Sequence, residues 1–272
     1  MDAFDLIQQA TQLNEPEDIE HDCIFYANTD EAVIIKSLCE FLHTNLAHTG
    51  NFKFTKNKIV LQGTDKEENC LIDFFLDKKN FNKYYCDRDY VRGVPLSNFY
   101  SMFKSLKKKD RVSIWITKNQ PTIIKSRIYN SDKERDSGSF TPTCDIPEVE
   151  ISLPTNYNEP VSIPANELQR MCRDIQIYKT LEVICYPGGM TFNAQDGDFI
   201  GKQFHYGNLP KEKDKHKIFK NIYDTQLFCK MAKLYGFSKR IHIYTFPQVP
   251  MKINTNIGTL GEMNIFIKED EK

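Results

Sequence analysis

One structural pattern occurs twice in this 272-residue chain, with copies roughly 130 residues apart. In the first copy, residues 31–45 have the apolar periodicity of an amphipathic helix, and the strand pair NFKFTKNKIVLQ follows. In the second copy, a helix over 165–177 precedes the strand pair TLEVICYPGGMTFNA. This spacing is long for a solenoid and is typical of tandem domains. The repeat therefore predicts two copies of one α+β domain.

Each copy also contains a second helix followed by a strand. The helices over 96–109 and 224–235 run into the strands DRVSIWITK and SKRIHIYTF. Residues 131–160, between the copies, combine charge, Ser, Gly and several prolines, as exposed linkers do. The predicted divisions are an N-terminal extension (1–22), a first domain (23–140), an interdomain connector (141–160) and a second domain (161–272).

Composition and motifs exclude several classes of protein. With 40% apolar and 27% charged residues, the chain has the composition of a soluble globular protein. No run approaches the roughly 20 apolar residues of a membrane span, and the acidic N-terminus is unlike a signal peptide. The eight cysteines lie singly, and no histidine pair, serine elbow or phosphate loop has the required context. We therefore expect an intracellular protein with no membrane association, no metal, no cofactor and no catalytic site.

Two smaller features leave alternatives open. Phe4, Ile7 and Leu13 have helical spacing in the acidic N-terminal stretch, which is either a short helix or a disordered tail. Asp196-Gly197-Asp198 lacks further acidic ligands at EF-hand spacing and is interpreted as a turn. Gly188-Gly189 is interpreted as part of a hairpin turn.

The charges are balanced overall, with 36 Lys and Arg against 37 Asp and Glu, so their distribution is the informative property. Each predicted helix places basic residues opposite its apolar stripe. A solvated face is the ordinary interpretation of one such helix, but four at equivalent places favour a surface for phosphates. The candidates are Lys36, His43, Lys104, Lys107, Lys108, Arg170, Arg173, Lys230 and Lys233.

Three segments resemble those of the eukaryotic sliding clamps, the proliferating cell nuclear antigen family. They are YYCDRDYVRGVPLSNFYSMFKSLKKKDRVSI, VSIPANELQRMCRDIQ and VPMKINTNIGTLGEMNIFI, in order along the chain from about residue 24 onwards. The resemblance implies a homotrimeric ring in which each chain contributes two tandem DNA-clamp domains of the processivity fold. Antiparallel sheets would form the outside, and four helices would line a channel around duplex DNA.

The resemblance also implies roles for the cations. Arg170, Arg173, Lys36, Lys104 and Lys233 match channel positions of the family. His43, Ser101 and Gln226 stand where many members carry Lys or Arg, so the channel would either hold DNA less firmly or use Lys107, Lys108 and Lys230 instead. Long cationic side chains on rigid helices hold phosphates without reading bases, so the binding of DNA would be independent of sequence.

A second surface implied by the resemblance is a groove for the clamp-binding peptide motifs of DNA polymerase and other proteins. DIPEVEISLP resembles the connector that forms one wall, with Ile151 and Leu153 at its apolar positions. Pro250, Phe266, Ile267 and Lys268 match the opposite wall. Thr64 and Asn69 replace apolar pocket residues of the family, so partner specificity is expected to differ. The alternative interpretation, without the resemblance, is that Ile151 and Leu153 only attach a loop to the body of the protein.

The resemblance implies a DNA sliding clamp placed on DNA by a clamp loader, acting in replication and repair as a polymerase processivity factor. The alternative is a clamp-fold interaction scaffold, or a monomeric polymerase accessory subunit, that does not encircle DNA. A cellular clamp would be nuclear, and a viral one could act in a cytoplasmic replication factory. Pro187 stands where cellular clamps carry the lysine that receives ubiquitin, so that modification is expected to be absent.

Overall fold

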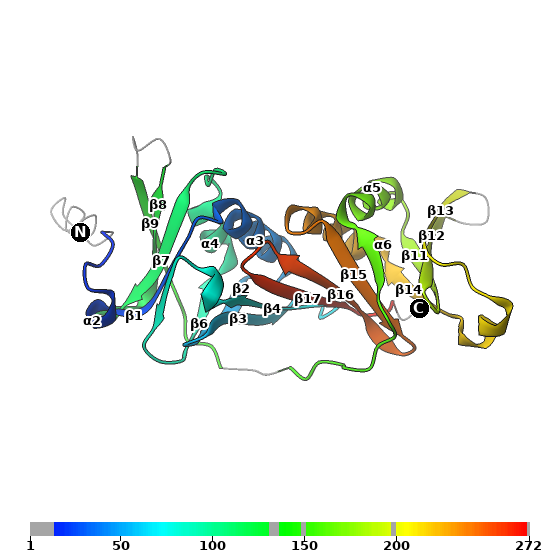
Figure 1. Ribbon diagram of the computed structural model, residues 1–272, viewed down its shortest axis with the longest axis horizontal. Helices are drawn as coiled ribbons and strands as arrows, with labels where there is room; N and C mark the ends of the chain where they lie inside the picture. The colour runs from blue at the N-terminus through cyan, green and yellow to red at the C-terminus, as the bar shows by residue number, and fades with distance from the viewer. Residues whose placement is uncertain (1–13, 131–135, 148–150, 197–199, 271–272) are drawn as a thin grey trace. The chain divides into compact units, whose positions relative to one another are not determined.

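The computed structural model describes residues 14–130, 136–147, 151–196 and 200–270. Contacts divide the chain into two compact units. Unit 1 comprises Met1–Gly63, Phe74–Glu150 and Ile257–Gly261, and unit 2 comprises Thr64–Asp73, Ile151–Asn256 and Glu262–Lys272. Both units consist mainly of antiparallel strands with few helices, which confirms the predicted α+β class (Figure 1).

Unit 1 is built on a five-stranded sheet with the order β5-β1-β7-β8-β9. Its strands are β1 (Cys23–Thr29), β5 (Lys83–Cys86), β7 (Arg111–Thr117), β8 (Gln120–Tyr129) and β9 (Asp136–Pro142). A second group of strands comprises β2 (Thr49–Phe54), β3 (Lys58–Thr64), β6 (Tyr90–Pro95) and the second half of β4 (Cys70–Asp77), whose first half belongs to unit 2. β2 pairs with β3, as the alternating residues of 51–62 predict, and its other edge pairs with β6.

Two helices cover the core of unit 1, α3 (Ala32–Asn45) and α4 (Leu96–Phe103). α3 buries Ile35, Leu38 and Leu42 along one stripe, as its apolar periodicity predicts. From α4, Phe99 packs on Phe52 of β2 with ring centroids 5.3 Å apart. The remaining short elements of this unit are α2 (Ile19–Asp22) and the 3₁₀ turn η1 (Lys78–Asn80).

Unit 2 contains a four-stranded sheet with the order β13-β12-β11-β14. Its strands are β11 (Thr180–Tyr186), β12 (Gly189–Asp196), β13 (Ile200–Gly207) and β14 (Phe219–Asp224). The other strands are β10 (Val161–Pro164), β15 (Arg240–Phe246), β16 (Val249–Ile257) and β17 (Gly261–Ile267). The helical elements are α5 (Ala165–Ile175), α6 (Thr225–Cys229), and the 3₁₀ helices η2 (Glu212–Lys217) and η3 (Lys230–Gly236). The predicted hairpin turn is confirmed, because β11 and β12 pair around Gly188, whose φ is +78°.

Three sequence-based predictions were wrong in their limits. The helix predicted over 96–109 ends at Phe103, because the Asp110 carboxylate accepts the backbone N–H of Lys107 at 2.8 Å and closes a turn there. The helix predicted over 224–235 is α-helical only to Cys229 and tightens into the 3₁₀ helix η3. Part of the predicted linker, Asp136–Pro142, is strand β9, since it pairs along β8.

Some predicted features lie outside the described residues, namely Phe4, Ile7, Leu13 and the Gly197-Asp198 portion of the acidic turn. Within the described ranges, no helix is long and apolar enough to cross a membrane. The same residues contain no group of three or more His, Cys, Asp or Glu side chains arranged to hold a metal ion.

Candidate nucleic-acid interface and partner groove

In unit 1, the predicted cations lie on α3 and on the turn that follows α4. The imidazole of His43 stacks on Tyr100 of α4, with ring centroids 5.6 Å apart and planes 16° apart. Lys36 Nζ donates to the Leu106 carbonyl at 3.5 Å, which leaves two ammonium protons for other acceptors. These contacts hold the segment after α4 beside α3.

The lysines of that segment extend the basic surface of unit 1. The side chains of Lys104, Lys107 and Lys108 are exposed. Because the helix ends at Phe103, they do not share one helical face, and the turn closed by Asp110 orients them instead. The sequence identified the cations of this surface correctly as exposed residues but assigned them the wrong backbone geometry.

In unit 2, α5 presents Arg170 and Arg173 to solvent. Arg170 forms an ion pair with Glu167 at 3.0 Å, one helical turn away, and its side chain remains 69% exposed. A surface pair of this kind contributes about 1 kcal/mol or less, so a phosphate can replace the glutamate. The neighbouring Asp174 carboxylate pairs with Lys202 of β13 at 3.3 Å.

The second basic element of unit 2 packs against α5. The Cys229 thiol at the end of α6 donates to the carbonyl of Cys172 at 3.3 Å. Lys230, half-buried, and Lys233, exposed, follow on η3. A 3₁₀ helix has three residues per turn, so these two lysines lie on one side of it. Lys230 and Lys233 therefore stay on the same side, although Gln226 no longer shares one α-helical face with them.

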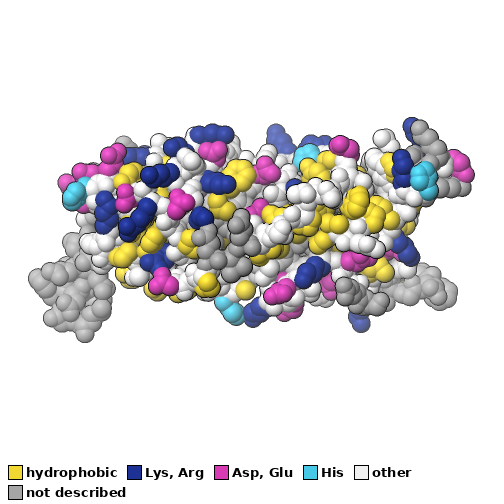
Figure 2. Space-filling model, turned by 90° about the horizontal axis from the view of Figure 1, so that it is seen from below, with side chains coloured by type: hydrophobic (Ala, Val, Ile, Leu, Met, Phe, Trp, Pro, Cys, Tyr) yellow, Lys and Arg dark blue, Asp and Glu magenta, His cyan; other side chains and the backbone are white. Residues whose placement is uncertain are grey.

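Cations are not confined to the helices. Figure 2 shows one face of the molecule, on which Lys and Arg side chains lie among Asp, Glu and apolar side chains.

The second candidate site is a hollow of about 690 Å³ in unit 2. It is lined by Asn69, Asp224, Leu227, Gln248, Val249, Pro250, Lys268, Glu269 and Asp270. Pro250 and Lys268 were predicted for this groove, and Asn69 was identified as a departure within it. The backbone N–H of Lys268 donates to the Asn69 carbonyl at 2.9 Å, which joins two walls that are far apart in sequence.

The other predicted groove residues lie differently. Phe266 and Ile267 are 6% and 0% exposed, so their side chains pack in the core of unit 2. Ile151 and Leu153 are half-buried and do not line the hollow itself. The connector nevertheless reaches its rim, because the Tyr157 hydroxyl donates to the Pro250 carbonyl at 2.9 Å.

Sequence reasoning missed the acidic part of this groove. Glu269 accepts hydrogen bonds from the Asn221 side chain at 3.1 Å and from the backbone N–H of Ile222 at 3.4 Å. The acidic run after β17 was the one sequence signal that could have indicated the charge of this groove.

The groove also contains an uncommon backbone conformation. Gln248, in the turn between β15 and β16, has a φ of +61°, which few residues with a side chain adopt.

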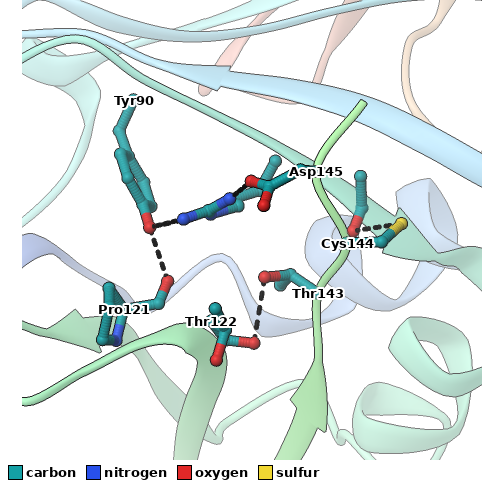
Figure 3. Close-up of polar contacts among 8 residues, drawn as sticks. Tyr90, Pro121, Thr122, Thr143, Cys144 and Asp145 are labelled. Atoms are coloured by element: carbon teal, nitrogen blue, oxygen red, sulfur yellow. Dashed lines mark hydrogen bonds and ion pairs between the residues drawn. The ribbon is translucent and has the colours of Figure 1, made fainter. Parts of the chain in front are cut away.

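The start of the connector is anchored on β6 in unit 1 (Figure 3). Gly93 and Cys144 exchange two backbone hydrogen bonds of 2.9 Å. A Cβ on Gly93 would lie 2.4 Å from Ile146 Cδ1, so the absence of a side chain at Gly93 permits this close approach. The guanidinium of Arg92 binds the Tyr90 hydroxyl at 2.7 Å and pairs with Asp145. The segment YVRG that follows CDR in the sequence therefore positions the connector.

The chain has two α+β units of antiparallel sheets, and each unit has helical elements accompanied by cations. It also has an anchored connector that reaches the rim of a groove. These features define the class of two-domain DNA-clamp proteins. Residues 24–143 match the family model described as proliferating cell nuclear antigen, N-terminal domain. Over these residues the chain is similar to the family, as the resemblance predicted. Proteins of this family are non-enzymatic processivity factors, and the similarity supports a DNA clamp function.

Two relatives are similar over nearly their whole length. The chain is 25% identical over 256 residues to "Probable DNA polymerase sliding clamp 1" of Paramecium bursaria Chlorella virus 1, covering 90% of this chain and 96% of the relative. It is 22% identical over 255 residues to "Proliferating cell nuclear antigen" of Dictyostelium discoideum, covering 90% and 98%. One relative is viral and the other eukaryotic.

Proposed function

We propose that this chain is a sliding clamp that encircles duplex DNA as a homotrimer and holds a DNA polymerase on its template. The proposal is carried by the exposed cations that lie on, or directly after, the helical elements of each unit, including Arg170 and Arg173 on α5 and Lys104 and Lys107 after α4. Contacts of this kind attract phosphates without reading bases, so the protein can slide. Closure of a ring supplies the hold that such weak contacts lack.

Two open sheet edges support ring formation. β9 and β13 each end a sheet and have one neighbouring strand. Phe140 on β9 and Ile200 on β13 are 50% and 67% exposed. Exposed apolar edge strands are templates for pairing with another chain. We infer that β9 of one copy pairs with β13 of the next, and the number of three copies follows the resemblance to the family.

The opposite edge of the unit 2 sheet is already occupied. The backbone N–H of Asp270 donates to the Ile222 carbonyl of β14 at 2.8 Å, and the Glu269 carboxylate accepts the Ile222 N–H. The C-terminal tail thereby covers part of β14. This leaves β13 as the longer free edge of that sheet in the described chain.

The groove beside Pro250 and Lys268 would bind short peptide segments of the polymerase and of other replication and repair proteins. Ile151 and Leu153 would contact them from the connector. A clamp loader would open the ring, and the site of action would be the nucleus, or a cytoplasmic replication factory for a viral clamp.

Encirclement can be tested without a loader. The protein is incubated with linear duplex DNA biotinylated at both ends, streptavidin is added to block the ends, and the complex is washed at high salt. A ring that has threaded onto the DNA stays bound only when the ends are blocked. Equal loss with and without streptavidin would contradict the proposal and favour the monomeric accessory subunit.

A further inference from the structure

The described part of the N-terminal extension, residues 14–22, lies on the face of the unit 1 sheet turned away from the main core (Figure 1). Tyr26 of β1 pairs with Trp115 of β7, and side chains alternate across a sheet, so both point away from the core that contains Phe25. Ile19 packs on this second cluster, together with Cys23. Trp115 is fully buried, and β1 is buried along its whole length.

Glu15 joins three strands of the sheet. Its carboxylate accepts hydrogen bonds from the hydroxyls of Tyr26 on β1, Tyr129 on β8 and Ser113 on β7, the last at 2.8 Å. Burial raises the pKa of Glu15, but these hydrogen bonds and the charge of Arg111 outweigh it and hold the pKa below its usual value. Glu15 is therefore ionised and firmly bound at neutral pH.

Asn14 extends these contacts to the edge of the sheet. Arg127 of β8 donates to the Asn14 side chain at 3.0 Å and to the Asp136 carboxylate at 3.3 Å. Asp136 is the first residue of β9. One guanidinium thus connects the N-terminal segment to the free edge strand.

The other end of the segment is also fixed. Lys118 Nζ donates to the Glu20 carbonyl at 2.9 Å, and the Lys118 backbone N–H donates to the Asp22 carbonyl at 2.8 Å. The Tyr85 hydroxyl binds the same Glu20 carbonyl at 3.2 Å. Residues 14–22 are therefore attached at both ends across β5, β1, β7 and β8.

We propose that residues 14–22 form a clasp that fixes the edge strand β9 in the conformation that pairs with a second copy of this chain. An edge strand with one neighbour is held by half the usual hydrogen bonds, and ordering it on association weakens binding. By holding Arg127, and through it Asp136, the clasp lowers that ordering cost. The inference deepens the proposed ring and rests on it for the identity of the partner.

The test compares three full-length variants. Glu15→Gln removes the charge of the carboxylate that accepts the three hydroxyl hydrogen bonds. Asn14→Ala, at an exposed position, removes the hydrogen bond from Arg127. Glu17→Gln is the control, because it makes the same charge change in the same segment at an exposed residue. Hydrogen exchange of β9 and the dissociation constant of the assembly are measured for each.

We expect both test variants to accelerate exchange in β9 and to raise the dissociation constant, by about tenfold for Glu15→Gln, which corresponds to about 1.4 kcal/mol. The control should match the wild type. Unchanged β9 exchange in both test variants, or equal acceleration throughout unit 1, would overturn the clasp. If the wild-type protein never associates, both the proposed ring and the role of the clasp in pairing are refuted. The hydrogen exchange of β9 would still show, independently of association, whether residues 14–22 stabilise this strand.

Discussion

Replacing Arg170 and Arg173 together by alanine should weaken the binding of duplex DNA and reduce its salt dependence. Each cation that neutralises a phosphate contributes about 0.9 to the slope of log K against log salt. For each protomer whose two arginines contact phosphates, the slope should fall by about 1.8. Between about 50 and about 200 mM salt, the wild type would then lose about 12-fold more affinity than the variant.

The effect should be readable in solution. Fluorescence anisotropy with a labelled duplex at several salt concentrations gives both the affinity and the slope. Both arginines are exposed, and Arg170 gives up only a surface pair with Glu167, so the variant should keep its fold. The loss should be the same for duplexes of different sequence, because phosphates are the ligand.

The matched control is Lys220→Ala with Arg240→Ala, which removes two exposed cations from strands β14 and β15 of the same unit. This control should bind DNA with the wild-type slope. An unchanged slope in the helix variant, an equal drop in the control, or a loss confined to one DNA sequence would refute the assignment of α5 to the phosphate-binding surface.

The remaining predictions concern the groove, the sheet edge and the N-terminal segment. Leu153→Ala should weaken binding of a clamp-binding peptide by roughly tenfold and impair polymerase stimulation while DNA affinity stays unchanged; unaltered stimulation would place the docking site elsewhere. Phe140→Asp should shift the sedimentation profile from assembly to single chain, since pairing would bury an unmatched charge, and an unchanged profile would exclude β9 from the interface. The lowered pKa of Glu15 means that its carboxylate stabilises the fold above the usual value of 4.5 and loses this effect as pH falls through the lowered value. Glu15→Gln should therefore cost about 1–3 kcal/mol of unfolding free energy at neutral pH and nothing in strong acid, and a difference independent of pH would contradict the ionised site.

Local patterns in the sequence predicted the helices that pack on a core, but they did not predict where every helix ends. α3 and α5 were predicted nearly to the residue, because one stripe of each is buried. The lysines after Phe103 continue a helical pattern, but the Asp110 side chain diverts the backbone. Side chain to backbone competition of this kind is decided by geometry and leaves little trace in periodicity.

The edge strands and the groove could be identified only once the three-dimensional fold was known. β9 and β13 are largely exposed and therefore lack the apolar alternation that identifies a half-buried strand. The groove combines positions as distant in sequence as Asn69 and Lys268, and only the resemblance to the family brought them together beforehand. The clasp is equally non-local, since Glu15 meets hydroxyls that lie about a hundred residues further along the chain.

The measurement that tests the central claim most directly is the mass of the protein in solution, by light scattering across a range of concentrations. A clamp that encircles DNA as a homotrimer should have three times the 31.8 kDa mass of the chain. A mass equal to that of the single chain at every concentration would contradict the ring.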